Sequence, residues 1–288
     1  MKFGIYYAYW EKEWQADYKY YIKKVAKLGY DILEIAATPI VDYSDDQIEE
    51  IKNCARENGI TLTVGHGPSK EHNLSSTDVS IRKKGIEFYE TLFDKLEKMD
   101  VHLIGGALNT YWPVNYDVDV DKTGDWNRGV EGIREIAKIA EEKGITLCIE
   151  VMNRFETYLL NTAEEGVKFV QEVDAPNVKV LLDTFHMNIE EDSIGGAIRT
   201  AGKYLGHMHI GESNRKVPGK GHLPWAEIHE ALNDIGYDNA VVMEPFEKMG
   251  GKVGTDIKVW RDLSDGASEQ ALDDRARQAL EFSRYILA

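Results

Sequence analysis

Segments typical of β-strands alternate with segments typical of α-helices along the whole chain. Eight short apolar runs have the strand pattern, at roughly 3–8, 31–37, 60–65, 101–107, 145–151, 178–183, 205–210 and 240–245. Helical segments fill the intervals, as expected of βα units around a parallel sheet. Because the alternation is eightfold and no change in composition interrupts it, we predict an α/β fold in which residues 1–288 form one (β/α)8 TIM barrel domain.

The predicted helices carry recognisable boundary signals. Residues 44–47, Ser-Asp-Asp-Gln, have the form of a capping box. Residues 131–143 place apolar side chains on one face and are followed by a glycine. The closing segment 268–287 is amphipathic, so we expect it to cover the outside of the barrel.

The composition excludes several classes of protein. Hydrophobic residues make up 43% of the 288 residues and charged residues 29%, a normal globular balance. The formal net charge of -16 repels phosphate backbones and anionic lipid, so we expect neither a nucleic-acid partner nor a membrane. The two cysteines, Cys54 and Cys148, lack metal or disulfide spacing, and no signal peptide precedes the first strand. We therefore expect a cytoplasmic protein.

Four residues that bind metals occupy the ends of consecutive predicted strands. Glu150, Asp183, His209 and Glu244 end the fifth to the eighth strand. In a TIM barrel, these strand ends meet at the face that holds the active site. The sequence therefore predicts a divalent metal site built from these four side chains.

The alternative for each acid alone is a rim residue that pairs with an arginine or caps a helix. Together, three carboxylates in a partly dry site repel one another by several kcal/mol unless a cation intervenes. One imidazole with three carboxylates suits Mn²⁺ or Co²⁺, and also Mg²⁺, better than structural zinc. His207 lies one layer deeper by strand alternation, so we interpret it as a hydrogen-bonded barrel filler.

Other polar and aromatic side chains follow the same strand ends. Glu156, His186 and Arg215 would suit a hydroxyl-rich ligand, although each could instead form a loop salt bridge. The aromatic residues at this end are Tyr6, Trp14, Trp112 and Phe246. Aromatic faces pack on the C–H surfaces of sugars while a few polar groups fix orientation.

These segments resemble the ketohexose 3-epimerases, which include D-psicose (D-allulose) and D-tagatose 3-epimerases. The resemblance covers essentially the whole chain and rests on residues 4–7, 105–108, 150–156, 182–191, 211–221 and 242–246. It implies one Mn²⁺-like ion per subunit, held by the four strand-end residues. It also implies sugar contacts from Tyr6, Ala107, Glu156, His186 and Arg215.

The resemblance further implies the reaction. We expect C3 epimerisation of free ketohexoses, D-fructose to D-psicose and D-tagatose to D-sorbose, through an enediolate. Glu150 and Glu244 would act as acid and base on opposite faces of the sugar. His66 stands where relatives carry a smaller or apolar residue, which bears on the preference at the far end of the ketose. A homodimer or a homotetramer is implied as well.

Other functions remain open at this level. An aldose–ketose isomerase of the same barrel type would move hydrogen between C1 and C2. A metal-dependent endonuclease would need a histidine-rich site and a basic surface, whereas this acidic chain has 8 histidines. The glycine-rich segment 250–254 suggests either a phosphosugar site or a simple turn. A non-catalytic sugar-binding barrel is the last alternative.

Overall fold

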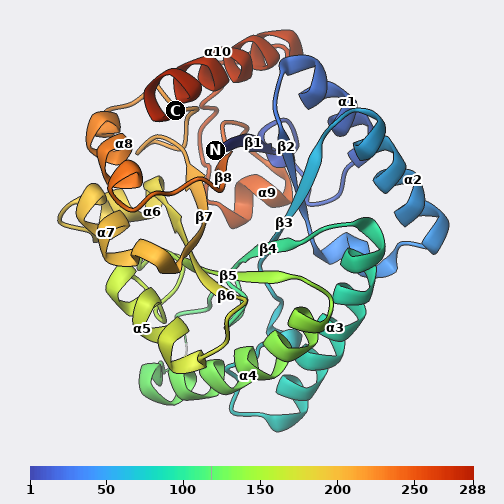
Figure 1. Cartoon of the computed structure of the whole chain (residues 1–288), viewed down its shortest axis with the longest axis vertical. Coiled ribbons are helices and arrows are strands. Elements are labelled where there is room, and N and C mark those ends of the chain that lie inside the picture. The colour runs from blue at the N-terminus through green and yellow to red at the C-terminus, as the bar shows by residue number, and fades with distance from the viewer. Residues whose placement is uncertain (118) are drawn as a thin grey trace.

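The structure is a computed structural model that describes residues 1–117 and 119–288. Eight parallel strands pair in sequence order, and β1 pairs with β8 to close a barrel (Figure 1). The strands are β1 (Lys2–Tyr6), β2 (Ile32–Ala36), β3 (Thr61–His66), β4 (Leu103–Gly106), β5 (Thr146–Val151), β6 (Val178–Asp183), β7 (Leu205–Ile210) and β8 (Ala240–Met243). The predicted TIM barrel is confirmed, and every predicted strand boundary lies within two residues of the observed one. The assignment of residues 1–288 to a single domain stays a prediction.

Helices surround the barrel, and one short helix lies over an end of it, inside the ring (Figure 1). They are α1 (Tyr18–Leu28), α2 (Asp45–Glu57), α3 (Val79–Met99), α4 (Lys122–Glu142), α5 (Ala163–Val173), α6 (Thr184–Glu190), α7 (Ile194–Ala201), α8 (Trp225–Asp234), α9 (Gly251–Asp256) and α10 (Glu269–Leu287). Ser44 and Gln47 form the predicted capping box of α2. The tyrosine hydroxyls of Tyr9 and Tyr30 donate to backbone carbonyls of α10, so the closing helix covers the barrel as predicted.

Helix α4 begins earlier than the sequence pattern indicates. The periodic segment predicted a helix from residue 131, whereas α4 starts at Lys122, where the Asp121 side chain caps it. Glycines have a low helix propensity, so the first half of α4 did not show the sequence pattern of a helix. They are needed because the helix packs tightly: a Cβ at Gly132 would lie 2.8 Å from Cβ of Leu74.

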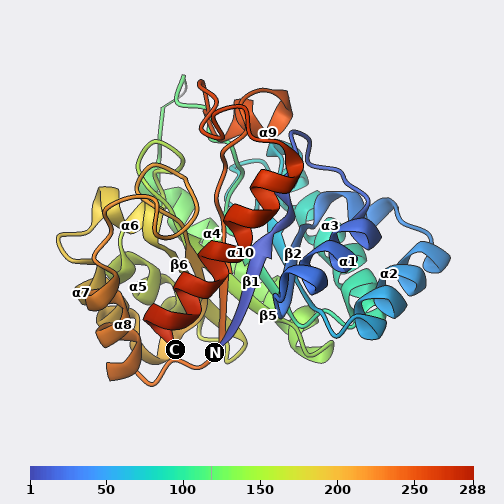
Figure 2. The same ribbon diagram turned by 90° about the horizontal axis from the view of Figure 1, so that it is seen from above.

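The two ends of the barrel differ in what covers them. Figure 2 places both chain termini at one end and α9 at the opposite end. Because β1 starts beside the N-terminus, the carboxyl ends of the parallel strands face the end with α9. Below the site the barrel is filled closely, since a Cβ at Gly105 would lie 2.5 Å from Cδ1 of Leu181. The strand ends therefore rest on a packed floor.

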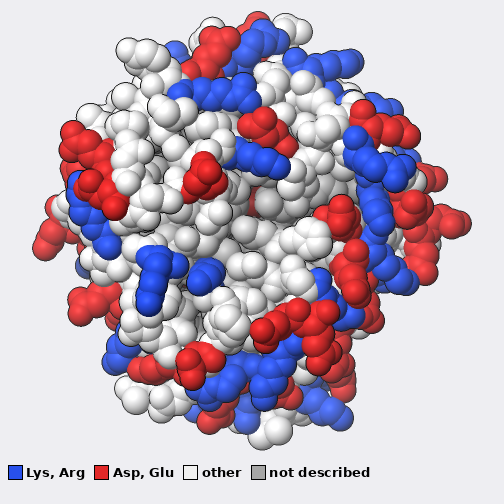
Figure 3. All heavy atoms as spheres, viewed as in Figure 1, with Lys and Arg blue, Asp and Glu red and all other residues white. Residues whose placement is uncertain are grey.

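Charge is spread over the surface. Acidic and basic side chains intermingle around the face shown in Figure 3, while the chain as a whole is acidic. Within residues 1–117 and 119–288, no helix has the length and apolar character needed to cross a bilayer.

Candidate active site

The carboxyl ends of four neighbouring strands bring the predicted metal ligands together. Glu150 lies in β5, Asp183 ends β6, His209 lies in β7 and Glu244 directly follows β8. Asp183 and His209 are register partners across the β6–β7 pair. Each of the four offers an oxygen or nitrogen within 4.8 Å of the others. The cluster therefore has the dimensions of a metal site.

The imidazole of His209 presents a free nitrogen to this cluster. Its Nδ1 is buried and has no hydrogen-bond partner. It lies 3.9 Å from Oε1 of Glu150 and 3.7 Å from Oε2 of Glu244. A buried nitrogen facing carboxylate oxygens at distances too long for hydrogen bonds fits a cation placed between them.

The electrostatics of the cluster also favour a cation. Burial, followed by the charge of Glu244, raises the pKa of Glu150 well above its usual range. Burial raises the pKa of Glu244 as well. At Asp183 burial acts in the same direction, but Arg215, His186, His209 and the backbone N–H of Phe185 together outweigh it and lower the pKa. Because Arg215 compensates only part of this charge, a divalent ion with a preference for oxygen ligands fits the donor set.

Three polar side chains, Glu156, His186 and Arg215, lie beside the metal cluster, and we call them the polar arm. The Arg215 guanidinium donates to Asp183 at 3.0 Å and to Glu244 at 3.2 Å. Its second terminal nitrogen lies 3.5 Å from Oε1 of Glu156. His186 Nε2 lies 3.5 Å from Oε1 of Glu150, so the arm touches both predicted catalytic glutamates.

Asn153 connects two members of this arm. Its side-chain nitrogen lies 2.7 Å from His186 Nδ1 and donates to Glu156 at 3.2 Å. Donation to Nδ1 places the imidazole proton on Nε2, the nitrogen that faces the metal cluster. Asn153 therefore orients the polar arm, although the sequence analysis did not assign it a role.

Four aromatic side chains, Tyr6, Trp14, Trp112 and Phe246, form an aromatic wall of the cavity. The ring centroid of Trp14 lies 6.4 Å from those of Tyr6 and Phe246 and 6.0 Å from that of Trp112. Trp112 also donates its indole N–H to Glu156 at 3.3 Å. The wall is thereby joined to the polar arm, around a cavity of about 500 Å³.

His66 reaches this cavity from β3 without a polar partner. Both of its ring nitrogens are buried and lack hydrogen bonds. The ring stacks on Phe88 at a centroid distance of 5.2 Å and an interplanar angle of 13°. Burial lowers the pKa of His66 to about 3, so the ring is neutral and offers one donor and one acceptor.

The glycine-rich segment after β8 leads into α9, with Gly250 at the N-cap and residues 251–254 inside the helix. Gly250 and Gly251 both have positive φ, and a Cβ at Gly251 would lie 2.2 Å from the carbonyl oxygen of Lys12. The ammonium group of Lys252 is paired with Asp256 at 2.6 Å. These contacts account for the segment without a phosphate.

Comparison with known proteins connects this site to an enzyme family. Residues 22–282 match the family described as Xylose isomerase-like TIM barrel. A D-psicose 3-epimerase from Ruminiclostridium cellulolyticum is 68% identical over 287 residues, a match covering 100% of this chain and 98% of the relative. The chain belongs to the ketose 3-epimerase family. It is accordingly an epimerase, an enzyme of the isomerase class, and the resemblance noted in its sequence is confirmed.

Solved structures of ketose 3-epimerases share the whole fold. A D-psicose 3-epimerase from Clostridium cellulolyticum H10, crystallised with D-tagatose, superposes with a TM-score of 0.99 at 68% identity. A D-psicose 3-epimerase crystallised in the presence of D-fructose gives a TM-score of 0.99 at 60% identity. Each match covers 100% of this chain and 99% of the solved chain.

In this ketose 3-epimerase, the predicted sugar contacts all line one cavity. They are Tyr6, Trp14, His66, Ala107, Trp112, Glu156, His186, Arg215 and Phe246. Glu150, His209 and Glu244 line the same cavity, while Asp183 is fully buried beside them. The sequence analysis missed Asn153 and Glu34, the latter a carboxylate inside β2 that accepts hydrogen bonds from His207 and His209. The signal for Glu34 was available, since it is a lone charged residue within an apolar strand.

Proposed function

We propose that this protein catalyses the metal-dependent C3 epimerisation of free ketohexoses, D-fructose to D-psicose and D-tagatose to D-sorbose. The observation that carries the proposal is the placement of Glu150 in β5 and Glu244 directly after β8, on either side of the Asp183 and His209 strand ends. Relatives named D-psicose 3-epimerase, one of them crystallised with D-tagatose, support this class of substrate.

The metal-binding residues are Glu150, Asp183, His209 and Glu244 in this proposal. Their three carboxylates and one imidazole suit Mn²⁺ or Co²⁺ and also accept Mg²⁺. When bound, such an ion supplies a Lewis acid that polarises the ketose carbonyl.

The two glutamates move the proton. One carboxylate removes the proton from C3, which leaves an enediolate, and the other glutamate returns a proton to the opposite face of C3. In the reverse reaction the two residues exchange roles. Glu150 and Glu244 have different polar neighbours, His186 at 3.5 Å and Arg215 at 3.2 Å, which hold each carboxylate in place.

The polar arm selects the carbon that lies between the glutamates. Arg215, His186 and Glu156 would bind the O1 and O2 end of the ketose, where the polar groups of the cavity gather. The aromatic wall would pack on the remaining carbons and exclude water. Since that wall makes few directional contacts, we expect turnover of more than one ketohexose.

Oligomeric state and location complete the proposal. We infer a homodimer or a homotetramer, which light scattering at several protein concentrations measures. We also infer a cytoplasmic location, which fractionation of the source cells tests.

The reaction can be followed by isotope exchange. The metal-loaded enzyme incubated with D-fructose in D₂O should form D-psicose and introduce deuterium at C3, because the proton removed exchanges with solvent before return. NMR of the sugar carbons measures both. Deuterium at C2 of an aldose product would instead establish an aldose–ketose isomerase, and neither label nor epimer would refute the proposal.

The two-base scheme predicts the behaviour of single variants. Glu150→Gln and Glu244→Gln should each lower kcat by at least the roughly 10²–10⁴-fold typical of general acid–base catalysis. Mn²⁺ should still bind, because the amide oxygen remains a ligand. Glu50→Gln, on the outer helix α2, is a matched control that should keep normal turnover. Near-normal kcat in either active-site variant would show that one glutamate suffices.

His66 should contact the distal hydroxyls of the sugar. His66→Leu removes both unpartnered nitrogens at similar volume, so the ratio of kcat/KM for D-fructose and D-tagatose, which differ at C4, should change by about 2- to 10-fold, the worth of one hydrogen bond. Steady-state kinetics measures this ratio. His102→Leu, at an exposed histidine, is the control. Equal losses for both sugars would assign His66 a packing role only.

A further inference from the structure

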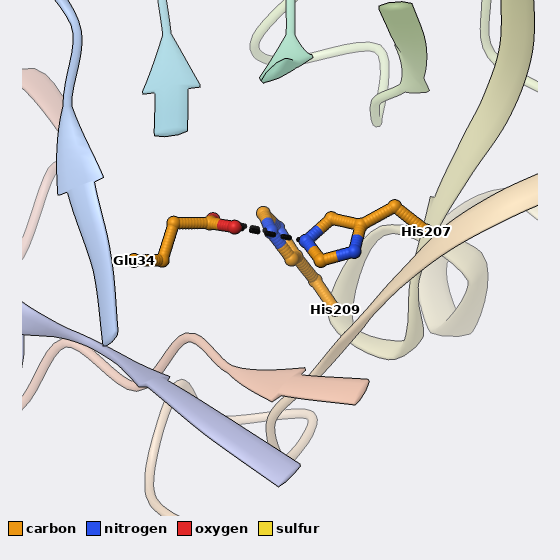
Figure 4. A group of neighbouring side chains, drawn as sticks. All are labelled: Glu34, His207 and His209. Carbon is orange, nitrogen blue, oxygen red and sulfur yellow. Dashed lines mark hydrogen bonds and ion pairs between the residues drawn. The ribbon is translucent and has the colours of Figure 1, made fainter. Parts of the chain in front are cut away.

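A second cluster of buried side chains shares His209 with the metal site. Glu34 lies in β2 with its side chain inside the barrel, and its carboxylate points toward the rings of His207 and His209 (Figure 4). Its Oε1 is 2.7 Å from Nε2 of His209 and its Oε2 is 2.9 Å from Nε2 of His207. Thr63 donates its hydroxyl to the same Oε2 at 2.7 Å.

The cluster is held by hydrogen bonds. Glu34, His207 and His209 have the composition of a metal site. A metal would lie about 2.0–2.1 Å from each histidine nitrogen, whereas here each nitrogen touches a carboxylate oxygen directly. The direct contacts leave no position for an ion between these atoms.

The contacts of Glu34 determine where the proton of His209 resides. A carboxylate that receives three donors acts only as an acceptor, so Nε2 of His209 must carry the hydrogen. A histidine that ligates a metal is neutral, so in that state the other nitrogen holds the lone pair. That nitrogen, Nδ1, is the buried and unpartnered atom that faces Glu150 and Glu244.

We propose that Glu34 is a positioning residue for the metal centre. Its hydrogen bond to Nε2 selects the His209 tautomer, aims Nδ1 at the cation and adds a negative charge behind the ligand. His207 holds the other oxygen of the Glu34 carboxylate and so fixes the plane that makes this contact. The inference rests on the metal site of the proposed function but not on which sugar is turned over.

Mn²⁺ binding without sugar tests this role. Glu34→Gln keeps the size of the side chain but replaces one acceptor oxygen with a donor and removes the charge. Isothermal titration at one pH should show Mn²⁺ binding about 10- to 100-fold weaker than in the wild-type protein, the usual effect of losing such a partner. Unchanged affinity would overturn the proposal.

Thr63→Val is the matched control. It removes a different hydrogen bond from the same carboxylate oxygen at nearly equal volume and leaves the link to His209 intact. Its Mn²⁺ affinity should stay close to that of the wild-type protein. Equal losses in the two variants would mean that the hydrogen-bond network as a whole, and not the Glu34–His209 contact, supports the site, which also overturns the proposal. A wild-type protein that fails to bind Mn²⁺ would refute the metal site itself, whereas normal Mn²⁺ results with no epimerisation would refute only the proposed reaction.

A measurement on the unaltered protein avoids the risk that a variant misfolds. In ¹⁵N-histidine NMR, the His209 signals are assigned by their absence from His209→Asn. Addition of Mg²⁺, which is diamagnetic, should shift the Nδ1 signal while Nε2 keeps its directly bonded proton. Loss of that proton on Mg²⁺ binding would place the metal on Nε2 and contradict the role of Glu34.

Discussion

The concentration of negative charge at the carboxyl end of the barrel is the constraint on which the rest of the site depends. Glu150, Asp183 and Glu244 lie within a few ångströms of one another, the first two buried and Glu244 half-buried. Such an arrangement costs several kcal/mol unless positive charge offsets it. Arg215 supplies part of that charge from within the chain, and a divalent ion would supply the remainder.

The barrel holds these carboxylates close together in spite of their mutual repulsion. Closure brings four consecutive strand ends to one point, and the packed interior beneath them prevents the side chains from relaxing apart. The same strands separate Glu150 from Glu244, so in the proposed mechanism the two carboxylates would approach a bound sugar from different sides. The polar arm and the aromatic wall then determine which part of the sugar reaches them.

Much of this arrangement could be predicted from the sequence. The period of the apolar runs predicted the barrel, and one residue at the end of each of four strands predicted the metal cluster. The sequence could not predict which imidazole nitrogen of His209 faces the metal site. Whether His209 uses Nδ1 or Nε2 depends on Glu34, which is 175 residues away in the chain and meets it only when the barrel closes. The early start of α4 was hidden for a related reason, because its glycines are explained only by the neighbour they pack against.

The position of the cation is the central claim, and anomalous diffraction from crystals grown with Mn²⁺ tests it most directly. The account predicts a single strong anomalous peak in each subunit, at coordination distance from Nδ1 of His209 and from the carboxylates of Glu150, Asp183 and Glu244. A peak between Glu34 and the Nε2 atoms of His207 and His209, or no ordered Mn²⁺ at the four strand ends, would contradict it.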